Sequence, residues 1–171
     1  LYNKQQPYKQ STRIPLNVRR PGQTESRRHE GMVEITDLSA TMLDAAGLEP
    51  REVLDTPGLS FHGRLPGRSL RSIVTGETDR PVRDCAFSVG DGCWSMIETE
   101  RWKLVRWVSD AVAEPGREEL FDLANDPDEL LNRAEDTACR KVLLDLHEKM
   151  LRIYESSPPC QMKWQWEGDL A

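Results

Sequence analysis

The sequence lacks several features that would point to a class of protein directly. No apolar run approaches the roughly 20 residues that a bilayer-spanning helix needs, so we expect no membrane partner. No CxxC pair occurs among the four cysteines, and their spacings fit no zinc site. Basic residues are outnumbered, with 23 Lys and Arg against 29 Asp and Glu. The formal charge of −6 therefore argues against a general nucleic-acid binder, and we expect no nucleic-acid partner.

The N-terminal end also lacks a basic-then-apolar leader, and the first residue is Leu1 rather than Met. We therefore expect a fragment whose true start lies upstream. The 171 residues, 37% hydrophobic and 30% charged, suffice for one domain or two small ones, and they are too apolar and too varied for a disordered chain.

Charge is distributed unevenly along the chain. Residues 1–31 hold seven Lys or Arg and two Glu, hence a formal charge of +5, and the remaining residues carry −11. A basic opening on an acidic chain indicates an anionic ligand or partner near it. For Arg27, Arg28 and His29 we favour a second interpretation, a solvated basic loop.

The cysteines allow two interpretations. Cys85 and Cys93 flank the turn signal Gly90-Asp91-Gly92, so they are candidates to face each other across a hairpin. The alternative, which we favour, is that the cysteines are buried free thiols.

Hydrophobic spacing in the first half predicts a strand and a helix. Ile14, Leu16 and Val18 alternate with other residues, which predicts a strand. Because Pro15 lacks an N–H, this is an edge strand or its nitrogen faces a gap in the hydrogen-bond ladder. A helix is expected over Asp37–Ala46, with Thr36 or Asp37 as N-cap, Gly47 just past its end, and Leu38, Met42 and Ala45 on one face. A long loop and a short helix over Ser69–Thr75 follow.

The second half predicts a small antiparallel meander and a covering helix. The expected strands are Cys85–Val89, Trp94–Thr99, Trp102–Val108 and Glu119–Leu123. A helical turn is expected at Asp128–Leu131, and a longer helix over Ala138–Tyr154 is expected to be capped by Thr137. Its apolar stripe should cover one face of the sheet and consists of Val142, Leu143, Leu146, Met150 and Ile153. Trp94, Trp102 and Trp107 are then core residues rather than a base-stacking surface.

Five motifs follow one another along the chain: Lys4–Leu16 (KQQPYKQSTRIPL), Val33–Gly47 (VEITDLSATMLDAAG), Pro66–Leu70 with Gly76-Glu77, Met96–Leu104 (MIETERWKL), and Glu119–Asn132 (ELFDLANDPDELLN). Each motif is weak alone. In this order they resemble the C-terminal portion of the type I sulfatases, within the alkaline-phosphatase-like superfamily.

The resemblance implies an α/β fold of the alkaline-phosphatase type, of which this chain is a fragment. Residues 1–76 would be the end of the catalytic domain, with its terminal strand and helix. Residues 77–157 would be a small subdomain, the meander packed by the C-terminal helix, and residues 158–171 a tail. The parent would be a sulfuric ester hydrolase acting on a sulfated small molecule or glycan. A phosphonate or phosphodiester hydrolase, or a non-catalytic interaction module, is the alternative.

The catalytic parts that the family needs are mostly absent from this sequence. The family's formylglycine arises from the cysteine of a Cys-x-Pro/Ala-Ser-Arg motif, and no cysteine here has that context. The resemblance therefore implies that calcium and formylglycine belong to the N-terminal catalytic portion of the same protein. No metal ligand is expected here, and Asp122, Asp126 and Asp128 are taken as turn and cap residues.

Two residues are candidates for the site. Lys4 matches the family lysine that binds an oxygen of the sulfate ester, although Lys9 stands where the family usually has Glu. A fixed ammonium at that place would stabilise the charge that develops on the leaving oxygen. His62 lies in a loop of a region that can border the substrate pocket in the family; we favour a surface histidine, with substrate contact as the alternative. Arg13 is expected to anchor its strand through an ion pair, and His147 to be structural.

Overall fold

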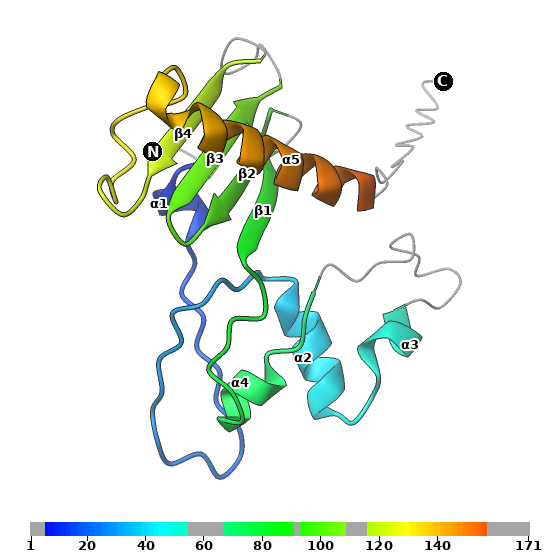
Figure 1. Cartoon of the computed structure of the whole chain (residues 1–171). Helices are drawn as coiled ribbons and strands as arrows, with labels where there is room; N and C mark the ends of the chain where they lie inside the picture. The colour runs from blue at the N-terminus through cyan, green and yellow to red at the C-terminus, as the bar shows by residue number, and fades with distance from the viewer. Residues whose placement is uncertain (1–5, 55–66, 91–92, 109–115, 157–171) are drawn as a thin grey trace, which may run out of the picture.

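A computed structural model describes residues 6–54, 67–90, 93–108 and 116–156 (Figure 1). Within these ranges four helices precede the sheet and a longer one follows it. Among these residues no helix is both long and apolar enough to cross a membrane. The elements, in chain order, are α1 (Lys9–Thr12), α2 (Asp37–Ala45), α3 (Pro50–Leu54), α4 (Arg71–Thr75), β1 (Cys85–Gly90), β2 (Trp94–Thr99), β3 (Trp102–Trp107), β4 (Glu118–Asp122), a 3-10 turn η1 (Thr137–Cys139) and α5 (Arg140–Ser156).

The four strands form the predicted meander. Their order in the sheet is β1-β2-β3-β4, and each neighbouring pair is antiparallel. The register pairs Ile97 with Leu104 across β2 and β3, and Leu104 with Leu120 across β3 and β4. These three side chains share one face of the sheet because side chains alternate along each strand.

Helix α5 covers that face, as its apolar stripe predicts (Figure 1). Leu143, Leu146 and Met150 are buried against Ile97, Leu104 and Leu120, while Val142 and Ile153 are partly buried at the margin. Side chains at positions i, i+3 and i+7 lie on one side of a helix, so a single stripe can meet a flat sheet.

The opposite face of the sheet carries a second core. Trp94, Met96, Val105, Trp107 and Phe121 are buried there, and Tyr8 packs against them. Trp102 lies on the α5 face and is partly buried. The prediction that these tryptophans are core residues is therefore confirmed.

The predicted edge strand over Ile14–Val18 is not formed in the described part of the chain. Its three apolar side chains are 47%, 40% and 39% exposed for Ile14, Leu16 and Val18. A strand needs a partner for its N–H and C=O groups, and the four strands of the described sheet pair with one another instead.

Helix α2 forms as predicted, and the side chains that it buries are not those of its apolar face. Gly47, with φ of +77°, follows its C-cap, and its left-handed conformation is the one that glycine adopts at low cost. The face that carries Leu38, Met42 and Ala45 is largely uncovered by the described residues, since Met42 is 68% exposed and Ala45 is exposed as well. The buried residues of the helix are Asp37, Ala40 and Thr41.

Two local predictions in the second half are corrected. No helical turn forms at Asp128–Leu131, because Glu129 takes a φ of +58° and the carboxylate of Asp126 accepts the N–H groups of Leu130 and Leu131. Asp136 rather than Thr137 caps the final helical segment, accepting the N–H of Ala138 at 2.9 Å. Both Asp side chains satisfy backbone donors that a turn leaves open.

The cysteines in the described residues are free thiols. Cys85 lies opposite Thr99 in the sheet and packs on the α5 face, whereas Cys93 packs on the other face, so a hairpin disulfide between them is excluded. Cys139 is buried. Burial and the neighbouring Asp84 raise the pKa of the Cys85 thiol. Cys160 lies outside the described residues.

The ion pair between Asp122 and Arg101 predicts acid sensitivity. The hydrogen bond from Arg101 holds the pKa of Asp122 at about 2, below the ordinary 3.8, so its contribution to stability is complete above pH 4 and is lost as pH falls toward 2. In Asp122→Asn, we expect the free energy of unfolding to fall at pH 7 and the difference from wild type to shrink between pH 4 and 2. Urea denaturation across this range measures it, and a difference independent of pH would contradict the assignment.

Candidate functional site

The segment that follows Lys4 in the sequence docks on the second face of the sheet. Lys4 itself and His62 lie outside the described residues, so the structure brings neither of them into a site. The residues next to Lys4 are described from Gln6 onward, and they include the fully buried Pro7. The geometry of this docked segment, residues 6–13, is therefore the part of the predicted site that can be analysed.

Tyr8 attaches the docked segment to the sheet. Its hydroxyl donates to Glu119 Oε2 at 3.1 Å, and its ring meets Phe121 edge-on at 6.3 Å between centroids. Burial and the Glu119 carboxylate raise the pKa of Tyr8 to about 12, so the phenol stays protonated and keeps donating at neutral pH. Arg117 pairs with the other oxygen of Glu119 at 2.7 Å.

Lys9 is held by the 127–129 turn at three points. Its backbone N–H donates to Glu129 Oε2 at 3.0 Å, its Nζ donates to the carbonyl of Pro127 at 2.7 Å, and its Nζ also pairs with the carboxylate of Asp128. This position departs from the family pattern in the sequence. The structure shows that Lys9, at the position where the family usually has Glu, pairs with the negatively charged side chain of Asp128.

A buried charged cluster lies beneath the docked segment. The Nζ of Lys103, with a side chain 0% exposed, donates to Glu129 Oε1 at 3.0 Å and lies 3.8 Å from Glu98 Oε2. Arg13 also pairs with Glu98, at 3.4 Å, which confirms the predicted ion-pair anchor although the strand around it does not form. Each end of α1 is thus tied to the same cluster, by Lys9 at its start and Arg13 just past its end.

Sequence reasoning missed this cluster, although one signal for it was present. In the strand predicted over Trp102–Val108, side chains alternate between the two faces, so Lys103 lies on the face opposite to Trp102 and Leu104. A lysine there is normally taken as solvated, because buried lysines are rare unless paired. The partner that changes this, Glu129, comes from a turn that hydrophobic periodicity does not describe.

The remaining acidic and histidine candidates have structural partners. Asp122 pairs with Arg101 at 2.9 Å, and Asp126 and Asp128 serve the turn and Lys9 as described. His147 Nε2 lies 2.7 Å from Glu118 Oε1, on the α5 side of the sheet, in accord with the structural role predicted for it. Within the described residues no group of three His, Cys, Asp or Glu side chains is arranged to hold a metal ion.

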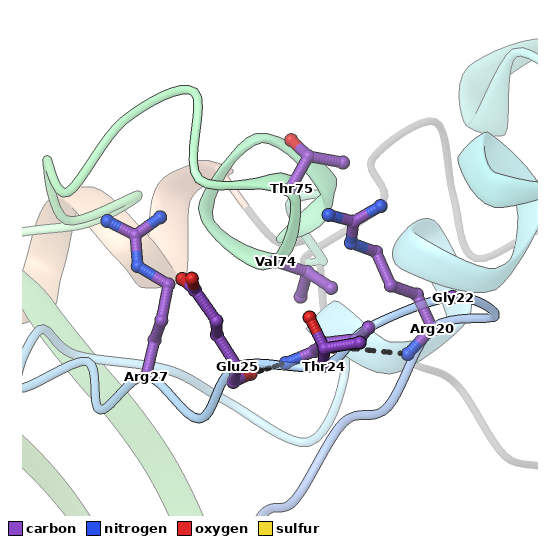
Figure 2. Close-up of a pocket in the computed structure, with 8 residues that line it drawn as sticks. Arg20, Gly22, Thr24, Glu25, Arg27, Val74 and Thr75 are labelled. Carbon is purple, nitrogen blue, oxygen red and sulfur yellow. Dashed lines mark hydrogen bonds between the residues drawn. The ribbon is translucent and has the colours of Figure 1, made fainter.

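A separate shallow pocket of about 150 Å³ lies between the 20–27 loop and α4 (Figure 2). Figure 2 shows Glu25 and Arg27 extending side by side toward α4, and Arg20 approaching Thr75 from the other side. The nearby Arg27 pairs with Asp79 at 3.6 Å, and Arg28 pairs with Glu30 at 2.5 Å. The pocket therefore carries both signs of charge, which agrees with the interpretation of this stretch as a solvated basic loop.

Known proteins resemble this chain over most of its length. Residues 1–156 match the family described as N-sulphoglucosamine sulphohydrolase, C-terminal. Arylsulfatase K of Gallus gallus is 33% identical over 134 residues, which cover 74% of this chain and 23% of that protein. The chain thus spans about a quarter of the length of this relative.

Solved structures share the fold. A phosphonate monoester hydrolase of Agrobacterium radiobacter superposes with a TM-score of 0.52 at 26% identity, covering 71% of this chain and 24% of that one. A protein in complex with its substrate D-glucosamine-2-N,6-O-disulfate superposes with a TM-score of 0.50 at 24% identity, covering 74% and 25%. The alkaline-phosphatase-like fold expected from the sequence motifs is confirmed by these neighbours.

Proposed function

Because this chain belongs to the sulfatase family, we propose that it is the C-terminal part of a hydrolase that cleaves sulfate esters. The part of the family that it matches is the C-terminal region of the N-sulphoglucosamine sulphohydrolase type. The observation that carries the proposal is the family match, which extends over residues 1–156 and includes all five sequence motifs. The substrate class is a sulfated small molecule or glycan. The solved relative with a glucosamine disulfate as its substrate is consistent with this class.

The chemistry is divided between this chain and the upstream portion. Calcium and formylglycine would polarise the sulfate group and supply the nucleophile when present. The described residues offer no site for the metal, and we derive no step through it. The contribution of this chain is Lys4, whose ammonium would bind an oxygen of the ester and stabilise the charge that develops on the leaving oxygen. His62 would border the substrate.

Exposed apolar side chains support an upstream partner. Ile14, Leu16 and Val18 are 47%, 40% and 39% exposed on a segment that pairs with none of the described strands, and Ile35 and Met42 are 64% and 68% exposed near α2. Exposed apolar surface of this kind normally meets another part of a protein. We propose that the N-terminal portion of the same protein covers it, and that residues 14–18 become an edge strand there.

A phosphonate monoester hydrolase is the second candidate function, because a protein of that name is among the structural neighbours at 26% identity. Both reactions involve a tetrahedral anionic ester, so the same lysine would serve either. Parallel assays of the full-length protein on an aryl sulfate and an aryl phosphonate monoester separate them. A much higher kcat/KM for the phosphonate would replace the first proposal by the second.

Lys4→Ala tests the proposed role of this chain. In the full-length protein we expect kcat for an aryl sulfate to fall by about 10²-fold, the usual cost of removing one group that stabilises transition-state charge. Lys141→Ala, on the exposed side of α5, is the matched control and should leave kcat unchanged. The isolated chain should not turn over the substrate. Metal-dependent turnover by the isolated chain, or full activity of Lys4→Ala, would contradict the proposal.

A further inference from the structure

We propose that Glu129, seated on the buried Lys103, is a positioning residue that fixes the backbone of Lys9 and so sets the course of the chain that leads back to Lys4. This inference deepens the proposed function and rests on it, since it gives Lys4 a structural support. The set of contacts concerned, called here the Lys9 clamp, comprises the Glu129 carboxylate, Lys103, the Pro127 carbonyl and the Asp128 carboxylate.

The two oxygens of Glu129 are used for different purposes. Oε2 accepts the backbone N–H of Lys9 at 3.0 Å, and Oε1 accepts Nζ of Lys103 at 3.0 Å. The side chains of Glu129 and Lys103 are 2% and 0% exposed. The lysine thus orients the carboxylate from within the sheet, and the carboxylate holds a backbone amide on the segment above.

This arrangement is costly, and its cost is concentrated at one residue. Taking two charges out of water is unfavourable, and a well-packed apolar pair at such a place often stabilises a protein equally well. Glu129 also adopts a φ of +58°, a left-handed conformation that residues with a side chain rarely take. The left-handed backbone of Glu129 and its ion pair with Lys103 together place the carboxylate where it accepts the backbone N–H of Lys9.

The docked segment is held at further points, so fixing Lys9 constrains its direction. Tyr8 donates to Glu119, and Arg13 pairs with Glu98, which is the second carboxylate beside Lys103. Lys4 comes five positions before Lys9 in the sequence and three before the buried Pro7. The catalytic role proposed for Lys4 requires a defined position, and small misplacements of such groups are costly in rate.

The test variant is Glu129→Gly. It removes both hydrogen bonds of the carboxylate, while glycine takes a φ of +58° without strain. The variant leaves the buried Lys103 with Glu98 as its neighbouring carboxylate, so overall stability is expected to fall, and exchange at Lys9 is compared with exchange at the β3 amides, which report that overall loss. Glu118→Gln is the matched control, because Glu118 lies on the other face of the sheet, where it contacts His147. Amide hydrogen exchange on the 171-residue chain should show the Lys9 amide exchanging about tenfold faster in Glu129→Gly and unchanged in Glu118→Gln. Unchanged exchange at Lys9 would overturn the clamp.

Activity in the full-length protein tests whether the clamp acts through Lys4. We expect Glu129→Gly to lower kcat by about tenfold with little change in KM, and to have no further effect when Lys4→Ala is already present. A merely structural role would give the same loss in both backgrounds and would overturn the inference. If Lys4→Ala alone is fully active, the proposed function of Lys4 fails, and the exchange result still reports separately on the clamp.

Discussion

Lys103→Ala is expected to lower the free energy of unfolding by about 3–5 kcal/mol, the usual cost of removing one partner from a buried ion pair. The substitution leaves the carboxylates of Glu98 and Glu129 without the ammonium that lies 3.8 and 3.0 Å from them. Both carboxylates are nearly inaccessible to water, so solvent cannot replace the lost partner. Loss of the methylene stem adds a cavity between the sheet and the docked segment.

Urea denaturation followed by tryptophan fluorescence measures this loss, since Trp94 and Trp107 are buried on the same face of the sheet as Lys103. Lys149→Ala is the matched control. It breaks the pair between Lys149 and Asp84, whose side chains are 42% and 78% exposed, and should cost less than about 1 kcal/mol. A loss for Lys103→Ala no larger than that of the control would contradict the buried pair.

Asp37→Ala is the second substitution for which we expect a large effect, again about 3–5 kcal/mol. The side chain of Asp37 is fully buried at the start of α2. Its carboxylate accepts the N–H of Glu34 at 2.8 Å and the N–H of Arg68 at 2.7 Å, and it pairs with the guanidinium of Arg83. Alanine would leave two backbone donors unsatisfied and would remove one of the carboxylates that pair with the buried Arg83.

The position of Asp37 makes the loss cooperative across separate segments. Arg83 also pairs with Glu34, and Glu34 accepts the N–H of Phe87 in β1 at 2.8 Å. The cluster therefore joins α2 to the 67–70 segment and to the beginning of the sheet. Faster hydrogen exchange at the α2 amides, together with a lower urea midpoint, is the expected result.

Asp79→Ala is the control for this second substitution. Asp79 pairs with Arg27 at 3.6 Å and is 81% exposed, so its removal should change stability by less than about 1 kcal/mol. Equal effects for Asp37→Ala and Asp79→Ala would show that Asp37 does not bridge these segments.

Local pattern determined much of the fold. The strands Trp94–Thr99 and Trp102–Trp107, and the helix that covers them, follow from alternation and from a 3.6-residue repeat. The end of α2 follows in the same way from Gly47, whose φ is +77°. These predictions held because each depends on residues a few positions apart in the sequence. Such residues lie close together whenever the helix or strand forms, whatever the rest of the fold.

Sequence patterns predicted only part of the candidate site. The family motifs single out Lys4 and His62 by order and spacing, and the sequence alone proposes them. It gave no reason to join Lys9 with Glu129, which lie 120 residues apart, or Arg13 with Glu98, which lie 85 apart. The turn at Glu129 was predicted as helix, and its left-handed backbone is what brings the carboxylate to Lys103.

The sequence holds no apolar run of about 20 residues and no CxxC pair, and its acidic residues outnumber its basic ones. By itself the sequence determined the family, the meander and its covering helix, since these follow from composition, from the order of the motifs and from the periodicity of the hydrophobic residues. Only the tertiary structure decided which charged residues are buried, and that Ile14–Val18 has no strand beside it here. The physical reason is that burial of a charge or pairing of a strand depends on partners that folding brings from distant parts of the chain.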